Sequence, residues 1–384
     1  MGKRFWFSFI VLSLLIIIVA YLRQGNSLPA TTIRKSIQAV VDKPQITPTT
    51  TPFPLENLTI PYLRKQTYKS KLGSLQQIAK NADYTSYLTS YPSDGLTING
   101  LLTVPVGIPP TGGWPAIVFV HGYIPPKTYT TTGNYTDYVD YLARNGFVVF
   151  KIDLRGNGDS QGQPAGAYYS AGYVVDTLNA YAALQSAHPV PTATSKEKIK
   201  AATASGAVDD SHNEQQMVDV NPVHIGLWGH SMAGNVVMRA WAAEPDIPAV
   251  VIWSGAGYTY TDLVKYKLND PSYQPSPSSS NSANVKLRQQ LQKLYGSPDL
   301  SKPFWHDMAP TSFLGDLQGA IQIDQAQDDA VVNIGYNRDL MKLFDATSVP
   351  HTMYEYPTGG HNISGTSFTQ AMQHTVEFYK QYLE

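Results

Sequence analysis

One serine in this 384-residue chain has neighbours that suit nucleophilic chemistry. Ser231 lies in the motif G-H-S-M-A-G at residues 229–234, between an apolar run at 223–228 and a stretch whose helical periodicity begins near Val236. A strand, a sharp turn and a helix would leave the serine hydroxyl at the tip of a strained turn, where small flanking residues are needed. The pattern therefore predicts a serine nucleophile, with a helix-capping serine as the alternative.

A serine hydroxyl is a poor nucleophile at neutral pH, so a base must take its proton and a carboxylate must orient that base. Among the nine histidines, His361 is the best candidate because it follows two glycines in a loop after an expected strand at 353–356. Such a loop would let the imidazole reach over the edge of a sheet. We therefore predict that His361 is the general base.

The carboxylate is expected in the segment after an apolar strand at 320–323. Asp328 and Asp329 are adjacent there, and two adjacent carboxylates cannot both point at one imidazole. Asp329 is favoured because the small residue Ala326 lies three positions before it, and Asp328 stays open as the alternative. Asp324 directly follows the strand, so we expect a structural role for it.

Backbone N–H groups aimed at the developing negative charge would complete such a site. One would come from Met232, directly after the serine. The second would come from Tyr123, in the loop that follows an apolar strand at 117–120. The aromatic ring of Tyr123 could also line an acyl pocket, which is compatible with a role for its backbone.

Strands and helices alternate from residue 116 onward, as a parallel sheet covered by helices on both faces requires. A β-hairpin at 84–105 and a short helix at 72–79 are expected before them. The expected strands are 116–120, 147–152, 225–228, 250–253, 320–323 and 353–356, and the expected helices are 135–144, 173–187 and 368–383. The sequence predicts an α/β fold with a mostly parallel, doubly wound sheet.

Two insertions interrupt this alternation. The segment at 190–220 is polar and alanine-rich, and we expect an exposed excursion there. The segment at 258–312 is rich in proline and serine and then shows helical periodicity at 285–294. Ligands of doubly wound sheets bind at the carboxyl ends of the strands, so the second insertion is a candidate lid, with an uninvolved surface loop as the alternative.

The chain begins with a segment typical of membrane targeting. Lys3 and Arg4 precede an uncharged apolar run from Phe5 to Leu22, which is near the length needed to cross a bilayer. We predict a retained transmembrane anchor at 1–23, with the folded domain outside the cytoplasm, and a cleaved signal peptide on a secreted protein as the alternative. Residues 24–57 are rich in proline and threonine and predict a linker to the domain at 58–384.

Composition excludes several classes of function. The net charge of -1 gives no electrostatic reason to expect a nucleic-acid partner. The chain has no cysteine, which excludes disulfides, thiol nucleophiles and thiolate metal sites. Histidine spacing gives no metal-binding motif, and we expect neither a metal nor another cofactor.

Four motifs, in this order, resemble those of the α/β-hydrolase fold. They are F-V-H-G-Y at 119–123, D-L-R-G-N-G-D-S at 153–160, G-H-S-M-A-G at 229–234 and G-G-H-N at 359–362. From about residue 82 to the end, the chain is most similar to the catalytic domains of prolyl oligopeptidase and acylaminoacyl peptidase and to dienelactone-hydrolase-like esterases. The resemblance implies the chain order nucleophile, acid, histidine, which Ser231, Asp329 and His361 follow. It also implies a structural loop at 155–160.

The chain departs from the family pattern at three positions. Ala233 stands where glycine is usual, Ala326 replaces the glycine before the acid, and Asn333 stands where proline is common. Oligopeptidases of this family commonly carry a large N-terminal β-propeller, and the residues before 82 do not resemble one.

These features predict a serine hydrolase that cleaves ester or amide bonds through an acyl-enzyme. A carboxylesterase acting on small-molecule esters is favoured because nothing resembles the propeller, and a peptidase acting on short peptides is the alternative. A catalytically inactive, anchored binding module and an acyltransferase are further alternatives. The sequence does not define the oligomeric state.

Overall fold

The computed structural model describes residues 54–187, 218–268 and 283–384. The predicted membrane anchor at 1–23, nearly all of the predicted linker and most of the first insertion lie outside these residues. Within the described ranges, no helix combines the length and the apolar character that crossing a bilayer requires. Membrane anchoring and signal cleavage therefore stay predictions from the first residues of the sequence.

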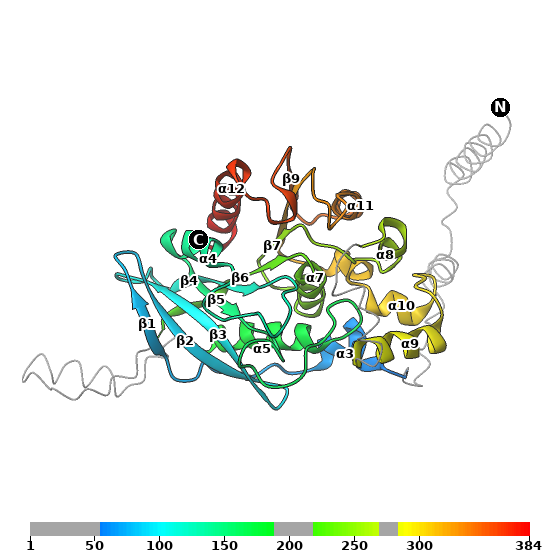
Figure 1. Cartoon of the computed structure of the whole chain (residues 1–384), viewed down its shortest axis with the longest axis horizontal. Coiled ribbons are helices and arrows are strands. Elements are labelled where there is room, and N and C mark those ends of the chain that lie inside the picture. Colours follow the sequence, from blue (N-terminus) through cyan, green and yellow to red (C-terminus); the bar gives the residue numbers. More distant parts are fainter. Residues whose placement is uncertain (1–53, 188–217, 269–282) are drawn as a thin grey trace, which may run out of the picture. The chain divides into compact units, whose positions relative to one another are not determined.

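A nine-stranded sheet forms the centre of the described fold, with the spatial order β1-β2-β3-β5-β4-β6-β7-β8-β9 (Figure 1). The strands are β1 (Gln76–Lys80), β2 (Tyr84–Ser93), β3 (Leu96–Pro105), β4 (Trp114–Val120), β5 (Val148–Ile152), β6 (Val220–His230), β7 (Ala249–Trp253), β8 (Ala320–Ala326) and β9 (His351–Tyr356). In this spatial order, every pair of neighbouring strands from β5 through β4 to β9 is parallel. The central strands are apolar runs buried on both faces, as parallel sheets require. The predicted mostly parallel α/β fold is confirmed, and the carboxyl ends of β4, β6, β8 and β9 lie at one edge.

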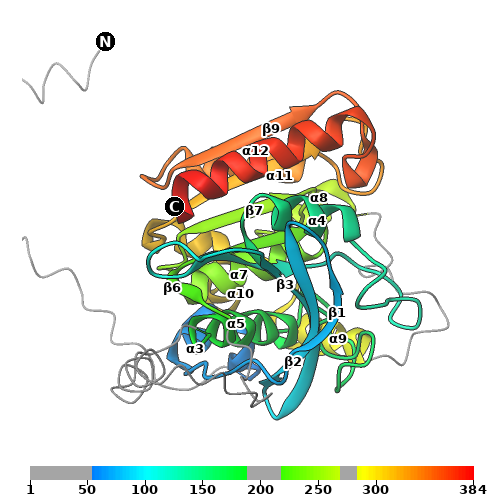
Figure 2. The same ribbon diagram turned by 90° about the vertical axis from the view of Figure 1, so that its left-hand side faces the viewer.

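The antiparallel side of the sheet begins with β1, β2 and β3, shown in blue to cyan in Figure 2. The hairpin predicted at 84–105 is confirmed, with Asp94 and Gly95 in left-handed conformations at its turn. The helix predicted at 72–79 is wrong, because Gln76–Lys80 forms β1 along the edge of β2. Every side chain of β1 is exposed, so no apolar face marks this strand in the sequence. Backbone pairing with the free edge of β2 decides its structure.

Helices cover both faces of the sheet (Figures 1 and 2). They are α3 (Ile60–Lys65), α4 (Thr136–Arg144), α5 (Gly172–Gln185), α7 (Ala233–Ala243), α8 (Thr261–Tyr266), α9 (Ala283–Tyr295), α10 (Pro303–Met308), α11 (Gly335–Phe344) and α12 (Thr366–Leu383), with short 3₁₀ helices η1 (Glu56–Leu58), η3 (Pro310–Asp316) and η4 (Gly360–Asn362). Adjacent strand residues face opposite sides. Val118 accordingly joins the apolar layer of α5, α7 and α11, whereas Phe119 joins that of α4 and α12.

The second insertion contributes α8, α9, α10 and the start of η3. The helical periodicity predicted at 285–294 is confirmed by α9, and residues 269–282 lie outside the described part. The described elements pack against the domain, since η3 contacts α7 and α8 contacts α11. Its action as a lid stays a prediction.

Candidate active site

Ser231 lies at the sharp turn between β6 and α7. Its backbone is in the left-handed region, with φ at 58°, where a residue with a side chain is strained. The Ser231 N–H donates to the carbonyl of Trp253 over 2.9 Å, which ties the turn to the end of β7. The structure therefore contains the strained strand-turn-helix unit that the sequence predicts.

Close contacts at this turn require glycine at two positions, 229 and 234. A Cβ on Gly229 would lie 2.8 Å from the Ala233 carbonyl oxygen, and a Cβ on Gly234 would lie 2.7 Å from the Cα of Gly255. Both distances are too short for real contacts, so glycine is required at 229 and at 234. Ala233 itself is fully buried at the start of α7. The motif has its second obligatory glycine one position later than usual.

His361 reaches Ser231 from the loop after β9. Its Nε2 lies 2.8 Å from Ser231 Oγ, and its Nδ1 lies 2.9 Å from Asp329 Oδ2. Because a carboxylate only accepts hydrogen bonds, Nδ1 carries the proton and donates to Asp329. The unprotonated Nε2 then accepts the hydrogen bond of the serine hydroxyl. The structure thus brings these three side chains into one continuous hydrogen-bonded path.

Asp329 is held as a carboxylate by the loop after β8. Burial alone would raise its pKa, but the hydrogen bond from His361 and the backbone N–H groups of Val331 and Val332 bring the pKa below its ordinary value. Those two N–H groups donate to Oδ1 over 2.8 and 2.9 Å. Gln325 adds a longer contact of 3.3 Å to Oδ2. The charge that would orient the imidazole is therefore stable at neutral pH.

The other two aspartates of this segment have different partners. Asp328 accepts from the backbone N–H groups of Gly360 over 2.8 Å and Gly359 over 3.3 Å. It therefore holds the histidine loop and not the imidazole. Asp324 is fully buried inside β8, where Gln322 and Tyr356 each donate to it over 2.7 Å. Its contacts are those of a structural residue.

The loop after β4 lies against the serine. A Cβ on Gly122 would be 3.1 Å from Ser231 Cβ, so this loop approaches the side chain of Ser231 closely. Within the described parts of the chain, the backbone N–H groups of Tyr123 and Met232 have no hydrogen-bond acceptor. Met232 is buried, whereas Tyr123 is 37% exposed. These two N–H groups can donate hydrogen bonds to a ligand oxygen beside Ser231.

His121 anchors the same loop to the end of β5. Its ring is fully buried and stacks on Tyr129 with centroids 4.4 Å apart. Nε2 lies 2.9 Å from the Asp153 carbonyl oxygen, and burial lowers the pKa of His121 to about 4. Tyr129 in turn donates to the Asp153 carboxylate over 2.8 Å. His121 is therefore a neutral structural residue beside the site.

The loop at 155–160 is structural, as the resemblance implies. Arg155 donates from Nη2 to Asp176 over 2.8 Å and from Nη1 to Asp94 over 3.1 Å. The Asp176 side chain is fully buried on α5. Arg155 therefore joins this loop to α5 and to the turn of the β2–β3 hairpin.

Sequence reasoning missed Tyr135 and gave His230 no specific role. The Tyr135 hydroxyl lies 2.7 Å from Nδ1 of His230 and accepts from the Gly122 N–H over 2.9 Å. Nε2 of His230 contacts the carbonyl oxygen of His361 over 2.9 Å. Tyr135 is one of 25 tyrosines, and no local pattern marks it, because all of its partners here come from distant segments.

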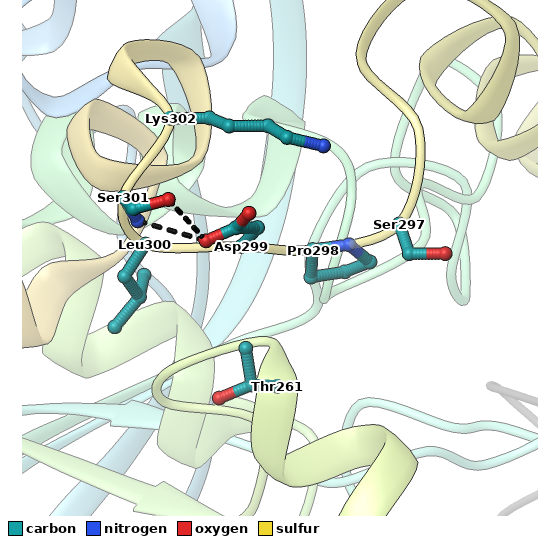
Figure 3. A pocket seen from close by; sticks show the side chains of 7 residues that line it. All are labelled: Thr261, Ser297, Pro298, Asp299, Leu300, Ser301 and Lys302. Atoms are coloured by element: carbon teal, nitrogen blue, oxygen red, sulfur yellow. Dashed lines mark hydrogen bonds between the residues drawn. The ribbon is translucent and has the colours of Figure 1, made fainter.

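A hollow of about 510 Å³ lies in the second insertion, between the start of α8 and the loop at 297–302 (Figure 3). Asp299 accepts from the backbone and the hydroxyl of Ser301 there, over 3.0 and 2.7 Å. Ser231, Asp329 and His361 are not among its lining residues. The residues that line this hollow therefore all belong to the second insertion, and the hollow is not part of the site around Ser231.

Comparisons with known proteins agree with this architecture. The chain resembles the acetyl xylan esterase from Paenibacillus sp. R4, at 15% identity over 84% of this chain and 92% of that chain, with a TM-score of 0.53. The chain also resembles acetyl xylan esterase 1 from Thermoanaerobacterium sp. JW/SL YS485, at 17% identity over 84% of this chain and 92% of that chain, with a TM-score of 0.51. A puromycin-hydrolyzing peptidase from Mycobacterium tuberculosis gives 15% identity over 79% of this chain and 40% of that chain, with a TM-score of 0.53.

At these identities the likeness to solved structures shows the fold alone, and no curated protein matches the chain by sequence. Residues 115–320 match the family described as the alpha/beta hydrolase fold. This range begins in β4, includes Ser231 and ends at the start of β8. The chain belongs to the α/β hydrolase family.

Proposed function

We propose that this protein is a serine hydrolase that cleaves carboxylic esters through an acyl-enzyme. The observation that carries the proposal is the path from Ser231 Oγ through the imidazole of His361 to Asp329, with contacts of 2.8 and 2.9 Å. Both distances are within hydrogen-bond reach, as proton transfer between a nucleophile and its base requires.

Each residue has a defined role in the proposed reaction. Ser231 Oγ attacks the carbonyl carbon while His361 Nε2 takes the hydroxyl proton, and Asp329 stabilises the imidazolium that forms. The N–H groups of Tyr123 and Met232 bind the negative oxygen of the tetrahedral intermediate. His361 then gives the proton to the leaving alcohol, and the carbonyl re-forms as an ester of Ser231. Water, deprotonated by His361, attacks this ester, and His361 returns the proton to Ser231 Oγ as the bond to the acyl group breaks and the acid is released.

Labelling with a fluorophosphonate tests the nucleophile. The native protein should react at Ser231, and Ser231→Ala should abolish both the label and hydrolysis. A catalytically inactive binding module would resist the label in the native form as well. A Ser231→Ala variant that still hydrolyses esters and is still labelled, at another serine, would reject Ser231 as the nucleophile.

The leaving group is the second question. Ester cleavage is favoured because the two acetyl xylan esterase structures are matched over 92% of their length, whereas this chain spans 40% of the peptidase. Amide cleavage is the second candidate, supported by the equal TM-score of 0.53 for that peptidase. Rates on p-nitrophenyl esters of increasing chain length, compared with aminoacyl and N-acyl peptide anilides, decide between them.

An added alcohol that outcompetes water for the acyl group would identify an acyltransferase.

We also propose that residues 1–23 anchor the enzyme to a membrane with the catalytic domain outside the cytoplasm. The support is the apolar run from Phe5 to Leu22 behind Lys3 and Arg4. Fractionation of cells that express the full chain tests this. Retention in the membrane fraction at high salt supports an anchor, and release of a shortened, soluble form identifies a cleaved signal.

A further inference from the structure

Tyr135 has a strained backbone directly before α4. Its φ and ψ are 61° and 25°, a left-handed conformation that a bulky residue rarely adopts. Such strain persists only where the surroundings fix it, and it is concentrated at functional sites. The ring packs against Phe119 and Trp228, with centroids 5.5 and 6.1 Å apart. This packing holds the ring where its hydroxyl meets Gly122 and His230.

The hydrogen bonds around the Tyr135 hydroxyl have only one consistent direction. The Gly122 N–H must donate, so the tyrosine oxygen accepts it over 2.9 Å. At the other end, the carbonyl of His361 must accept, so His230 donates from Nε2 over 2.9 Å. A neutral imidazole with a proton on Nε2 accepts at Nδ1. The Tyr135 hydroxyl therefore donates to Nδ1 over 2.7 Å.

His230 is suited to this neutral, single-tautomer role. It is 2% exposed, and burial lowers its pKa to about 3, with a further lowering by the nearby His361. His230 thus stays uncharged through the pH range of most hydrolases. Its two ring nitrogens have different fixed partners, which orients the ring between the Tyr135 hydroxyl and the His361 backbone.

The geometry points to Tyr135 as a positioning residue: its hydroxyl couples the loop that carries the Tyr123 N–H to the backbone of His361. The inference rests on the proposed function of the site. One hydrogen bond fixes the Gly122 peptide directly before Tyr123, and the relay through His230 fixes the carbonyl of the base. Loss of the hydroxyl would leave the Gly122 N–H and His230 Nδ1 without this partner, and both loops could then shift.

The variant Tyr135→Phe tests the relay because it removes only the hydroxyl. We expect kcat on a p-nitrophenyl ester to fall roughly 10- to 100-fold with KM changed less than about twofold, since small misplacements of reacting groups act on the chemical step. Affinity for phenylboronic acid, which forms a tetrahedral adduct with a serine, should fall with kcat. Rates are normalised to the fraction of sites that fluorophosphonate labels, so unfolded protein does not contribute.

Tyr141→Phe, on the helix α4 that follows Tyr135, is the matched control. In the described parts of the chain its hydroxyl has no hydrogen-bond partner, so kcat should stay within about twofold. The double variant Tyr135→Phe, His230→Gln distinguishes a relay from two separate effects. If Tyr135 acts through His230, the two losses in kcat are much less than multiplicative.

The outcomes separate this inference from the proposed function. A native protein that neither reacts with fluorophosphonate nor hydrolyses esters overturns the proposed function. A native protein that does both, together with a Tyr135→Phe variant of unchanged kcat, overturns the relay alone. Multiplicative losses in the double variant also overturn it. If Tyr135→Phe does not fold, His230→Gln alone provides the test, with the same expected loss in kcat.

Discussion

Asp328 and Asp329 are adjacent in the chain, but their carboxylates bind different parts of the loop that carries His361. Asp329 accepts from the ring of His361 over 2.9 Å. Asp328 accepts from the backbone N–H of Gly360 over 2.8 Å. One side chain therefore orients the imidazole, and the other holds the peptide beside it.

Replacing each aspartate by asparagine should separate these roles. In Asp329→Asn, the amide oxygen is expected to keep the two backbone N–H bonds of Oδ1, which leaves the amide NH₂ facing Nδ1 of His361. That donor stabilises the tautomer with the proton on Nε2, which cannot accept the serine proton. We expect kcat to fall about 10³- to 10⁴-fold, measured by ester hydrolysis under saturating substrate.

Asp328→Asn is the matched control for this loss. The asparagine oxygen can still accept from Gly360, so only the weaker bond to Gly359 is lost. We expect kcat to fall less than about tenfold, because the imidazole keeps its charged partner. Equal losses in the two variants would contradict the division of roles.

Much of this arrangement could be predicted because it follows local rules. Apolar strands, helical periodicity and glycine-rich turns mark β4 to β9 and the positions of Ser231 and His361. The relay through Tyr135 could not be predicted. The hydroxyl meets Nδ1 of His230, 95 positions away, and only the folded topology brings such residues together.

Local sequence patterns also fail to predict structure where pairing or contact with another segment determines it. The strand β1 exposes all of its side chains, so its pattern contains no apolar face that predicts a strand. The obligatory glycine at 234 is set by the Cα of Gly255, a contact outside the motif. In both cases the deciding neighbour comes from another segment, as tertiary context commonly overrides local preference.

The pair Gly234→Ala and Ala233→Gly tests the account of the turn. The new methyl group at 234 would lie 2.7 Å from Gly255 Cα and 3.1 Å from Ile252 Cγ2. Such overpacking is expected to destabilise the fold by about 1–3 kcal/mol. Ala233→Gly restores the usual motif and should cost only about 0.5–1 kcal/mol through backbone entropy. Urea denaturation measures both, and a larger loss for Ala233→Gly would reject the account.

Asp324 predicts a specific dependence of stability on pH. Burial raises its pKa to about 7, although Gln322 and Tyr356 donate to it, whereas an aspartate in the unfolded chain titrates near 3.9. Between these values the folded chain holds a proton that the unfolded chain has released. The contribution of Asp324 to stability is therefore full below about pH 4 and is lost as the pH rises through about 7.

Asp324→Asn removes this titration and nearly preserves shape. The melting temperature of the native protein minus that of the variant should decrease steadily from pH 4 to pH 7, as measured by calorimetry. Subtraction removes the contributions of other groups, such as Asp153, whose pKa burial raises to about 6. A difference that stays constant over this range would show that Asp324 keeps its ordinary pKa in the folded protein.

The ion pair of Arg155 and Asp176 should dominate the stability of the loop at 155–160. Asp176 is fully buried and accepts from the Arg155 backbone over 2.9 Å, from its guanidinium over 2.8 Å and from Ser93 over 2.7 Å. Asp176→Ala leaves the half-buried guanidinium without its main partner and should destabilise the fold by about 3–5 kcal/mol. Glu355→Gln, which weakens the exposed pair with Arg338, is the control and should barely change stability. Urea denaturation followed by circular dichroism compares the two, and similar small losses would mean that the burial of Asp176 adds little to its pairing.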